Sequence, residues 1–165
     1  MDNLEYRYCE LRSNESEIKG TIISFGDVAN RGLFTEEFIK DSVKYDDVIV
    51  NIAHDRTKPV ARLGSSLEIE KRDNQLTAII KPPDTTYGRD VRAMVDAGIL
   101  RGLSMEFFAV EDRWEGQHRI VEKAELHGIG VVDNPSYAKS QIEKRWKEWN
   151  DGNIIIPGND VIFYY

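Results

Sequence analysis

The sequence predicts a mainly β domain that also carries a few α-helices (α+β), with its strands forming a closed or nearly closed β-barrel. Three observations lead to this fold class. Short runs rich in β-branched residues recur along the chain, whereas helical patterns are few. Turn signals separate neighbouring runs, as β-hairpins require. Hydrophobic residues make up 41% and charged residues 31% of the 165 residues, which is typical of one globular domain with a core.

The first third of the chain predicts two strands and a helix. Residues 18–28 are rich in β-branched side chains and predict a strand. At Thr35 a capping hydroxyl precedes two acidic residues, which predicts the start of a helix. The apolar face of that helix would consist of Phe38, Ile39 and Val43. A second strand over residues 48–53 leads directly to His54.

The middle of the chain predicts a hairpin and then a helix. Residues 67–71 and 76–81 flank a polar turn, and two prolines end the second strand because proline cannot donate to a ladder. Thr85 or Thr86 then caps a helix that Gly98 closes in a left-handed conformation.

The last third predicts an antiparallel pair and one more helix. Residues 104–114 and 118–132 are separated by a turn at Glu115-Gly116, and a helix follows over residues 136–149. We therefore expect a single domain over residues 1–150. Residues 151–165 form a separate apolar tail, which is either a docked strand or an end removed by processing.

Charge and composition exclude several classes of function. The formal net charge is −7, and an acidic chain repels phosphate backbones, so nucleic acid is not an expected partner. The single cysteine, Cys9, permits no intramolecular disulfide. No stretch approaches the roughly 20 apolar residues that span a bilayer, and no secretion signal is present, so no membrane is expected.

Four candidate residues could carry chemistry. His54 lies at a strand-to-loop junction, where functional side chains are common. His118 follows a turn and is expected to be exposed, and His127 lies in an apolar stretch that suits a structural histidine. Ser104 begins a strand, but Glu106 stands where the second glycine of a G-x-S-x-G elbow would be, which disfavours an α/β-hydrolase.

The residues indicate no cofactor and no metal. The chain has no zinc motif, no P-loop and no dinucleotide fingerprint. A metal-dependent hydrolase that uses His54, Asp55 and His127 has too few ligands to be favoured. The residues alone therefore indicate a β-rich domain with a hydrolytic site.

Four segments of the chain, in this order, carry motifs of a known family. They are Gly20–Phe25 with Gly32–Phe38, Val50–Asp55 with Leu63–Gly64, Thr86–Asp90 with Gly98–Phe107, and Ala124–His127 with Val132–Ala138. These segments resemble the tailed-bacteriophage prohead (procapsid) maturation proteases, which are distant relatives of the herpesvirus assemblins. The resemblance covers residues 18–140 and implies an assemblin-like barrel.

The resemblance also implies a catalytic serine and its base. The nucleophile carries over to Ser104 and the general base to His54. The third member of the triad follows the serine strand in assemblins and is a histidine there, which places it at His127. Glu125 has the same strand parity and is the rival. We favour His127 over Glu125.

The resemblance implies a serine endopeptidase of viral procapsid maturation. Its substrates would be a capsid scaffold, or the scaffolding segment of the major capsid protein, and its own ends. It would act inside the assembling procapsid, in the host cell cytoplasm. Assemblins work as dimers, so a homodimer is implied, and the face with Trp146 and Trp149 is either that interface or core. The alternative is a catalytically inactive barrel of the same ancestry that serves as a scaffold or capsid-assembly factor.

Overall fold

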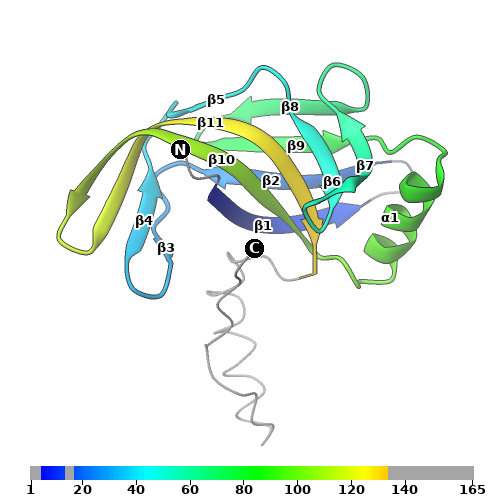
Figure 1. The fold of residues 1–165 in the computed structure, drawn as a ribbon, viewed down its shortest axis with the longest axis horizontal. Helices are drawn as coiled ribbons and strands as arrows, with labels where there is room; N and C mark the ends of the chain where they lie inside the picture. Colours follow the sequence, from blue (N-terminus) through cyan, green and yellow to red (C-terminus); the bar gives the residue numbers. More distant parts are fainter. Residues whose placement is uncertain (1–4, 14–16, 134–165) are drawn as a thin grey trace, which may run out of the picture.

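The computed structural model describes residues 5–13 and 17–133, and these residues form a curved β-sheet with one helix (Figure 1). The strands are β1 (Glu5–Ser13), β2 (Ile18–Ser24), β3 (Ala29–Asn30), β4 (Thr35–Phe38), β5 (Val43–Lys44), β6 (Ile49–Ile52), β7 (Asp55–Arg62), β8 (Leu67–Arg72), β9 (Gln75–Ile80), β10 (Gly102–Glu115) and β11 (His118–Val132). The helix is α1 (Thr86–Asp96).

The long hairpin of β10 and β11 organises the sheet. The order of hydrogen-bonded strands is β3-β4-β11-β10-β1-β2-β9-β8. On its other edge β11 pairs in parallel with β4, then β5, then β6, and β6 pairs with β7. In Figure 1 the tip of the β10–β11 hairpin lies beside β3 and β4 at one end, and α1 lies at the other end.

The mainly β prediction is confirmed, with differences in detail. In the described residues the strands form one curved 11-stranded sheet in which no closed barrel is found: its main path runs from β3 to β8, and β6 and β7 branch from β11. The same residues contain one helix where a few were expected. The expected helix over residues 136–149 and the tail over residues 151–165 lie outside the described part of the chain.

The predicted helix start at Thr35 is wrong. Residues Thr35–Phe38 form β4, which pairs in parallel with the first residues of β11. Strand alternation turns Glu36 and Phe38 inward, and both are fully buried. Phe38 packs in the core, and the carboxylate of Glu36 accepts a hydrogen bond from Arg119 Nη1 at 3.0 Å. These tertiary contacts decide the structure against the local capping signal.

The predicted hairpin and the predicted central helix are confirmed. The strands β8 and β9 pair across a two-residue turn at Asp73 and Asn74. Thr85 caps α1, since its Oγ1 accepts a hydrogen bond from the backbone N–H of Gly88 at 3.1 Å. Gly98 ends this segment with a φ of 71°, in the left-handed region.

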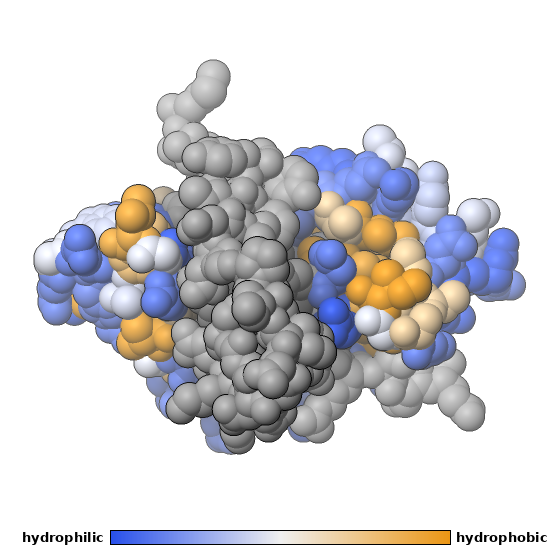
Figure 2. Space-filling view, turned by 90° about the horizontal axis from the view of Figure 1, so that it is seen from below, coloured by the Kyte–Doolittle hydropathy of each residue, from blue (hydrophilic) through white to orange (hydrophobic). Residues whose placement is uncertain are grey.

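Large apolar side chains reach solvent at both ends of the face in Figure 2. Among the exposed large apolar residues, Leu33 precedes β4 and Trp114 lies near the end of β10, while Tyr87 lies in α1 and Ile99 follows it. Neither pair belongs to the polar cluster described below. No helix of the described residues is long and apolar enough to cross a membrane.

Candidate active site

The three strands β6, β11 and β10 lie side by side (Figure 1). They present an apolar face to the core and a polar face on the other side. The core face carries Val50, Ile52, Leu103, Met105, Ile129 and Val131. Successive side chains alternate between the two faces of a strand. The residues next to these along each strand therefore point to the opposite face, and they are Asn51, Ser104, Glu106, Gly128 and Gly130.

Strand register aligns these residues in rows. Gly130 pairs with Ser104 on one side and with Asn51 on the other. In the next row, Gly128 pairs with Glu106. Directly paired residues project to the same face of a sheet, so the two rows form one polar cluster.

His54 reaches this cluster from the turn between β6 and β7. The turn has Ala53 and His54 as its central residues, with φ angles of 51° and 61°. Positive φ at both central positions is typical of a type I′ hairpin turn, which usually contains asparagine or glycine. An alanine in this conformation is strained, and such strain is often found at functional sites. The backbone N–H of Ala53 donates to the carbonyl of Val131 at 2.9 Å and ties the turn to β11.

The imidazole of His54 lies directly over Gly130. A β-carbon built on Gly130 would lie 2.7 Å from Cε1 and 2.8 Å from both ring nitrogens of His54. Only glycine leaves room for the ring at that position. Because Gly130 pairs with Ser104, the ring of His54 lies beside the serine on the same face of the sheet.

Glu106 fixes the orientation of this ring. His54 Nδ1 lies 2.6 Å from Glu106 Oε1, and Arg56 Nη2 donates to Glu106 Oε2 at 3.4 Å. Glu106 is 1% exposed, so its carboxylate is held by these partners rather than by bulk water. A β-carbon on Gly128 would lie 2.7 Å from Glu106 Oε2, so this glycine makes the room for the carboxylate.

The side chain of Ser104 is buried on this face of the sheet. The residue is 0% exposed, and its Oγ has no hydrogen-bond partner within the described part of the chain. With Nδ1–H donated to Glu106, the other ring nitrogen of His54, Nε2, is the one that can take a proton. The cluster thus brings a hydroxyl, an imidazole and a carboxylate to one face of the sheet, and these are the three kinds of group that a serine triad uses.

The structure places His127 and Glu125 apart from this contact. The pairing of β11 with β10 passes from Gly128 opposite Glu106 to Leu126 opposite Phe107, so His127 is an extra residue in a β-bulge. Its side chain is 42% exposed, its ring packs edge-on against Phe108, and its Nε2 lies 3.7 Å from Glu125 Oε2. The carboxylate that contacts His54 is that of Glu106.

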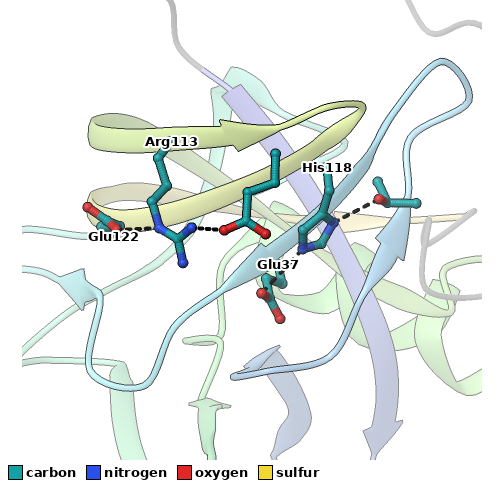
Figure 3. Close-up of polar contacts among 6 residues, drawn as sticks. Glu37, Arg113, His118 and Glu122 are labelled. Atoms are coloured by element: carbon teal, nitrogen blue, oxygen red, sulfur yellow. Dashed lines mark hydrogen bonds and ion pairs between the residues drawn. The ribbon is translucent and has the colours of Figure 1, made fainter.

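His118 lies at the far end of the β10–β11 hairpin (Figure 3). Its Nδ1 is 2.8 Å from the Thr35 hydroxyl, and its Nε2 is 3.2 Å from Glu37 Oε1. In the same view Arg113 Nε donates to Glu122 at 2.8 Å. These contacts join β4 to the hairpin tip and assign His118 a structural role.

Asp55, which follows His54, faces its own loop. Its carboxylate accepts hydrogen bonds from the Thr57 hydroxyl at 2.6 Å and from the Thr57 backbone N–H at 2.9 Å. These two bonds, together with Lys58, lower the pKa of Asp55 from 3.8 to about 2. Asp55 therefore orders the start of β7 next to the histidine.

Sequence reasoning missed Glu106, although a signal was present. Ser104 and Glu106 are two residues apart on a strand, so their side chains share a face. The pair Gly128 and Gly130 on the neighbouring strand has the same spacing.

In the described residues, no group of three or more histidine, cysteine, aspartate and glutamate side chains gathers as a metal site.

Comparison with known proteins gives a family and a fold. The family described as Caudovirus prohead serine protease matches residues 3–153 of this chain. No curated protein matches the chain.

Among solved structures, the chain is similar to the capsid assembly protease of bacteriophage T4, gp21. The two share 11% sequence identity with a TM-score of 0.58, and the match covers 81% of this chain and 98% of the other. At this level of identity the likeness shows a common fold.

Proposed function

Because this chain belongs to the caudovirus prohead serine protease family, we propose that it is a serine endopeptidase of procapsid maturation in which Ser104 attacks, His54 is the general base and Glu106 positions His54. The observation that carries this proposal is the contact of 2.6 Å between His54 Nδ1 and Glu106 Oε1, in a ring that lies beside Ser104. The family supports a serine peptidase, and the geometry supports this choice of residues.

Glu106 replaces His127 and Glu125 as the proposed third member of the triad. A residue in this role must accept the Nδ1–H of the base histidine and stabilise the imidazolium that forms. Glu106 is buried and within hydrogen-bond distance of Nδ1. His127 and Glu125 are both largely exposed and contact one another. An anionic carboxylate also stabilises the imidazolium better than a neutral imidazole would.

The first half of the reaction forms an acyl-enzyme. The Oγ of Ser104 attacks the carbonyl carbon of the scissile peptide bond, while its proton passes to Nε2 of His54. The resulting tetrahedral intermediate collapses, the C–N bond breaks, and the proton on Nε2 moves to the departing amine nitrogen. Glu106 accepts the Nδ1–H throughout and offsets the positive charge that appears on the ring.

The second half returns the free enzyme. A water molecule replaces the amine, His54 takes one of its protons, and the hydroxide attacks the acyl carbon. The ester bond to Ser104 then breaks, and the proton on His54 returns to Oγ. The net reaction adds one water across the peptide bond.

Arg56 supports the carboxylate from the solvent side. Its guanidinium lies 3.4 Å from Glu106 Oε2, and its side chain is otherwise exposed. A guanidinium at this distance attracts the carboxylate and helps to hold it in place. Arg56 is therefore proposed as a positioning residue that acts through Glu106.

We infer the substrates and the setting from the family. The proposed substrates are the capsid scaffold or the scaffolding segment of the major capsid protein, together with the protease's own ends. Cleavage would take place inside the assembling procapsid in the host cell cytoplasm. We also propose a single domain over residues 1–150 and a homodimer. Sedimentation at several protein concentrations would test the homodimer.

One observation favours a second candidate, an inactive capsid-assembly factor of the same ancestry. Ser104 is 0% exposed, whereas an enzyme must admit a peptide to its nucleophile. Labelling with a fluorophosphonate, which modifies only activated serines, separates the two candidates. An enzyme is labelled at Ser104, and an assembly factor is not labelled.

The full test is co-expression with the capsid protein of the same virus. Intact mass should show defined cleavage by the wild-type chain, none by Ser104→Ala and none by His54→Ala. Circular dichroism should show both variants folded. Cleavage by Ser104→Ala would refute the proposed function.

A further inference from the structure

Asn51 carries a buried side-chain amide that makes no hydrogen bond to any described residue. The residue is 1% exposed, and neither Nδ2 nor Oδ1 has a hydrogen-bond partner within the described ranges of the chain. A buried polar group without a partner destabilises the folded state. Native structures contain few such groups, and each calls for an explanation such as a functional role or a bound water.

The position of Asn51 relates it to the proposed active site. Asn51 pairs with Gly130, and Gly130 pairs with Ser104, so the three residues form one row across β6, β11 and β10. Adjacent strands lie about 4.8 Å apart, which puts the Cα atoms of Asn51 and Ser104 about 10 Å from one another. The ring of His54 fills the space over Gly130, the middle residue of this row.

The side chain of Asn51 points to the polar face. Its neighbours on β6, Val50 and Ile52, are part of the core cluster and therefore face the other way. Asn51 thus lies on one flank of His54, and Ser104 lies on the other flank. An apolar residue at position 51 would leave no buried group unpaired, so packing alone does not account for the amide.

We propose that Asn51 binds the main chain of the substrate on the leaving-group side of the scissile bond. This inference rests on the proposed function. His54 takes the proton of Ser104 and delivers it to the departing amine, so the amine must lie next to His54. The peptide that continues from this amine then runs past His54, away from Ser104, toward Asn51.

The chemistry of a carboxamide suits this role. It offers two N–H donors and an acceptor oxygen, which match the C=O and N–H of a peptide group. It stays neutral over the working pH range, so it recognises any peptide main chain rather than a charged side chain. Substrate binding would supply the hydrogen bonds that Asn51 lacks in the free enzyme.

The experiment uses two substrates with the same sequence before the scissile bond. Peptides released from denatured host protein by the wild-type enzyme, identified by mass spectrometry, supply a cleaved sequence. One substrate is that peptide in full, and the other ends at the scissile bond in an aminomethylcoumarin amide, which has no peptide group beyond it. The measured quantity is the ratio of kcat/KM for the full peptide to kcat/KM for the coumarin amide.

The expected result is a selective loss in Asn51→Leu. The ratio should fall by about tenfold, the effect of one lost hydrogen bond, while kcat/KM for the coumarin amide and the rate of fluorophosphonate labelling stay within about twofold of wild type. The melting temperature should stay level or rise, because leucine removes an unpaired buried amide. Asn51→Asp should also lower the ratio, since aspartate has no N–H donor.

Ser42→Ala is the matched control. Ser42 is also buried, and its hydroxyl has no hydrogen-bond partner among the described residues, but it adjoins Ala124, about 20 Å along β11 from Gly130. This variant should leave the ratio unchanged. An unchanged ratio in Asn51→Leu, equal losses on both substrates, or a marked drop in melting temperature would each overturn the inference. Absence of labelling in the wild-type enzyme would instead refute the proposed function.

Discussion

The imidazole of His54 occupies the space that a side chain on Gly130 would need, since a β-carbon there would lie 2.7 Å from Cε1 of the ring. The residue on β11 that pairs with Ser104 must therefore be glycine, because any side chain there would clash with the ring of His54. The same holds one row away, where Gly128 makes room for Glu106. The two glycines are as much part of the proposed site as the groups that react.

Gly130→Ala should displace the ring of His54 and abolish cleavage. The added methyl group cannot be accommodated without a shift of the ring, and overpacking of this kind costs about 1–3 kcal/mol of stability. Fluorophosphonate labelling should fall by at least about 100-fold, because the base no longer reaches Ser104. Lys123→Ala, an exposed change on the same strand, is the control and should label at the wild-type rate.

Glu106→Gln should keep the fold and lose most of the activity. The neutral amide can present its N–H₂ to Nδ1 and cannot stabilise the imidazolium, so cleavage should fall by about 10³–10⁴-fold, as in other triads. The pH dependence of labelling should change, and Glu106→Asp should recover part of the rate. His127→Ala and Glu125→Ala are the matched controls. A larger loss in either control than in Glu106→Gln would assign the third member there.

Ala53→Gly should stabilise the protein. Ala53 has a φ of 51°, a conformation that costs a residue with a β-carbon about 1 kcal/mol and costs glycine little. Glycine also loses more conformational entropy on folding, which offsets part of this relief, so the free energy of unfolding in urea should rise by about 0.5 kcal/mol. Ala93→Gly, at an exposed position in the middle of α1, should instead lower it by about 0.5–1 kcal/mol. Equal destabilisation by the two changes would show that the turn at Ala53 is unstrained.

The carboxyl of Asp55 should titrate near pH 2. Its pKa is lowered to about 2 by the Thr57 hydroxyl first, then by the Thr57 backbone N–H and by Lys58. Because the folded pKa lies below the unfolded one, the stabilisation is complete above about pH 4 and disappears as the pH falls toward 2. In Thr57→Val the pKa should move back toward 3.8, as carboxyl carbon NMR would show. Asp84, whose pKa is lowered by Arg89, should titrate unchanged.

The sequence correctly predicted the turns and helix caps whose contacts are between residues close together in the chain. The turn between β8 and β9 and the cap at Thr85 are formed by neighbours in the chain, so the sequence reveals them. The segment at Thr35 carries a local helix signal. However, Glu36 in this segment bonds to Arg119, which is 83 residues further along the chain, and no local pattern reveals such a contact. The long-range pairing of β4 with β11 outweighed the short-range preference.

Some residues of the proposed site could be predicted from the sequence, and others could not. His54 and Ser104 lie in short motifs that resemble a family, and the structure brings both to one face of the sheet. Glu106 could have been inferred from its spacing to Ser104, because alternation along a strand puts both on one face. The bulge that gives β11 its extra residue at His127 cannot be inferred from spacing, and this bulge decides which residues line up with Ser104.

The pairing of β11 also determines when the protein can become active during its synthesis. One edge of β11 receives β4, β5 and β6 in turn, and the contact of Thr35 with His118 spans 83 residues of chain. Until the chain as far as Val132 has left the ribosome, β11 is incomplete. Without Gly128 and Gly130, the ring of His54 cannot pack in its observed position. The proposed site therefore cannot form on a nascent chain that lacks β11, and any cleavage by this site would begin only after β11 has been translated.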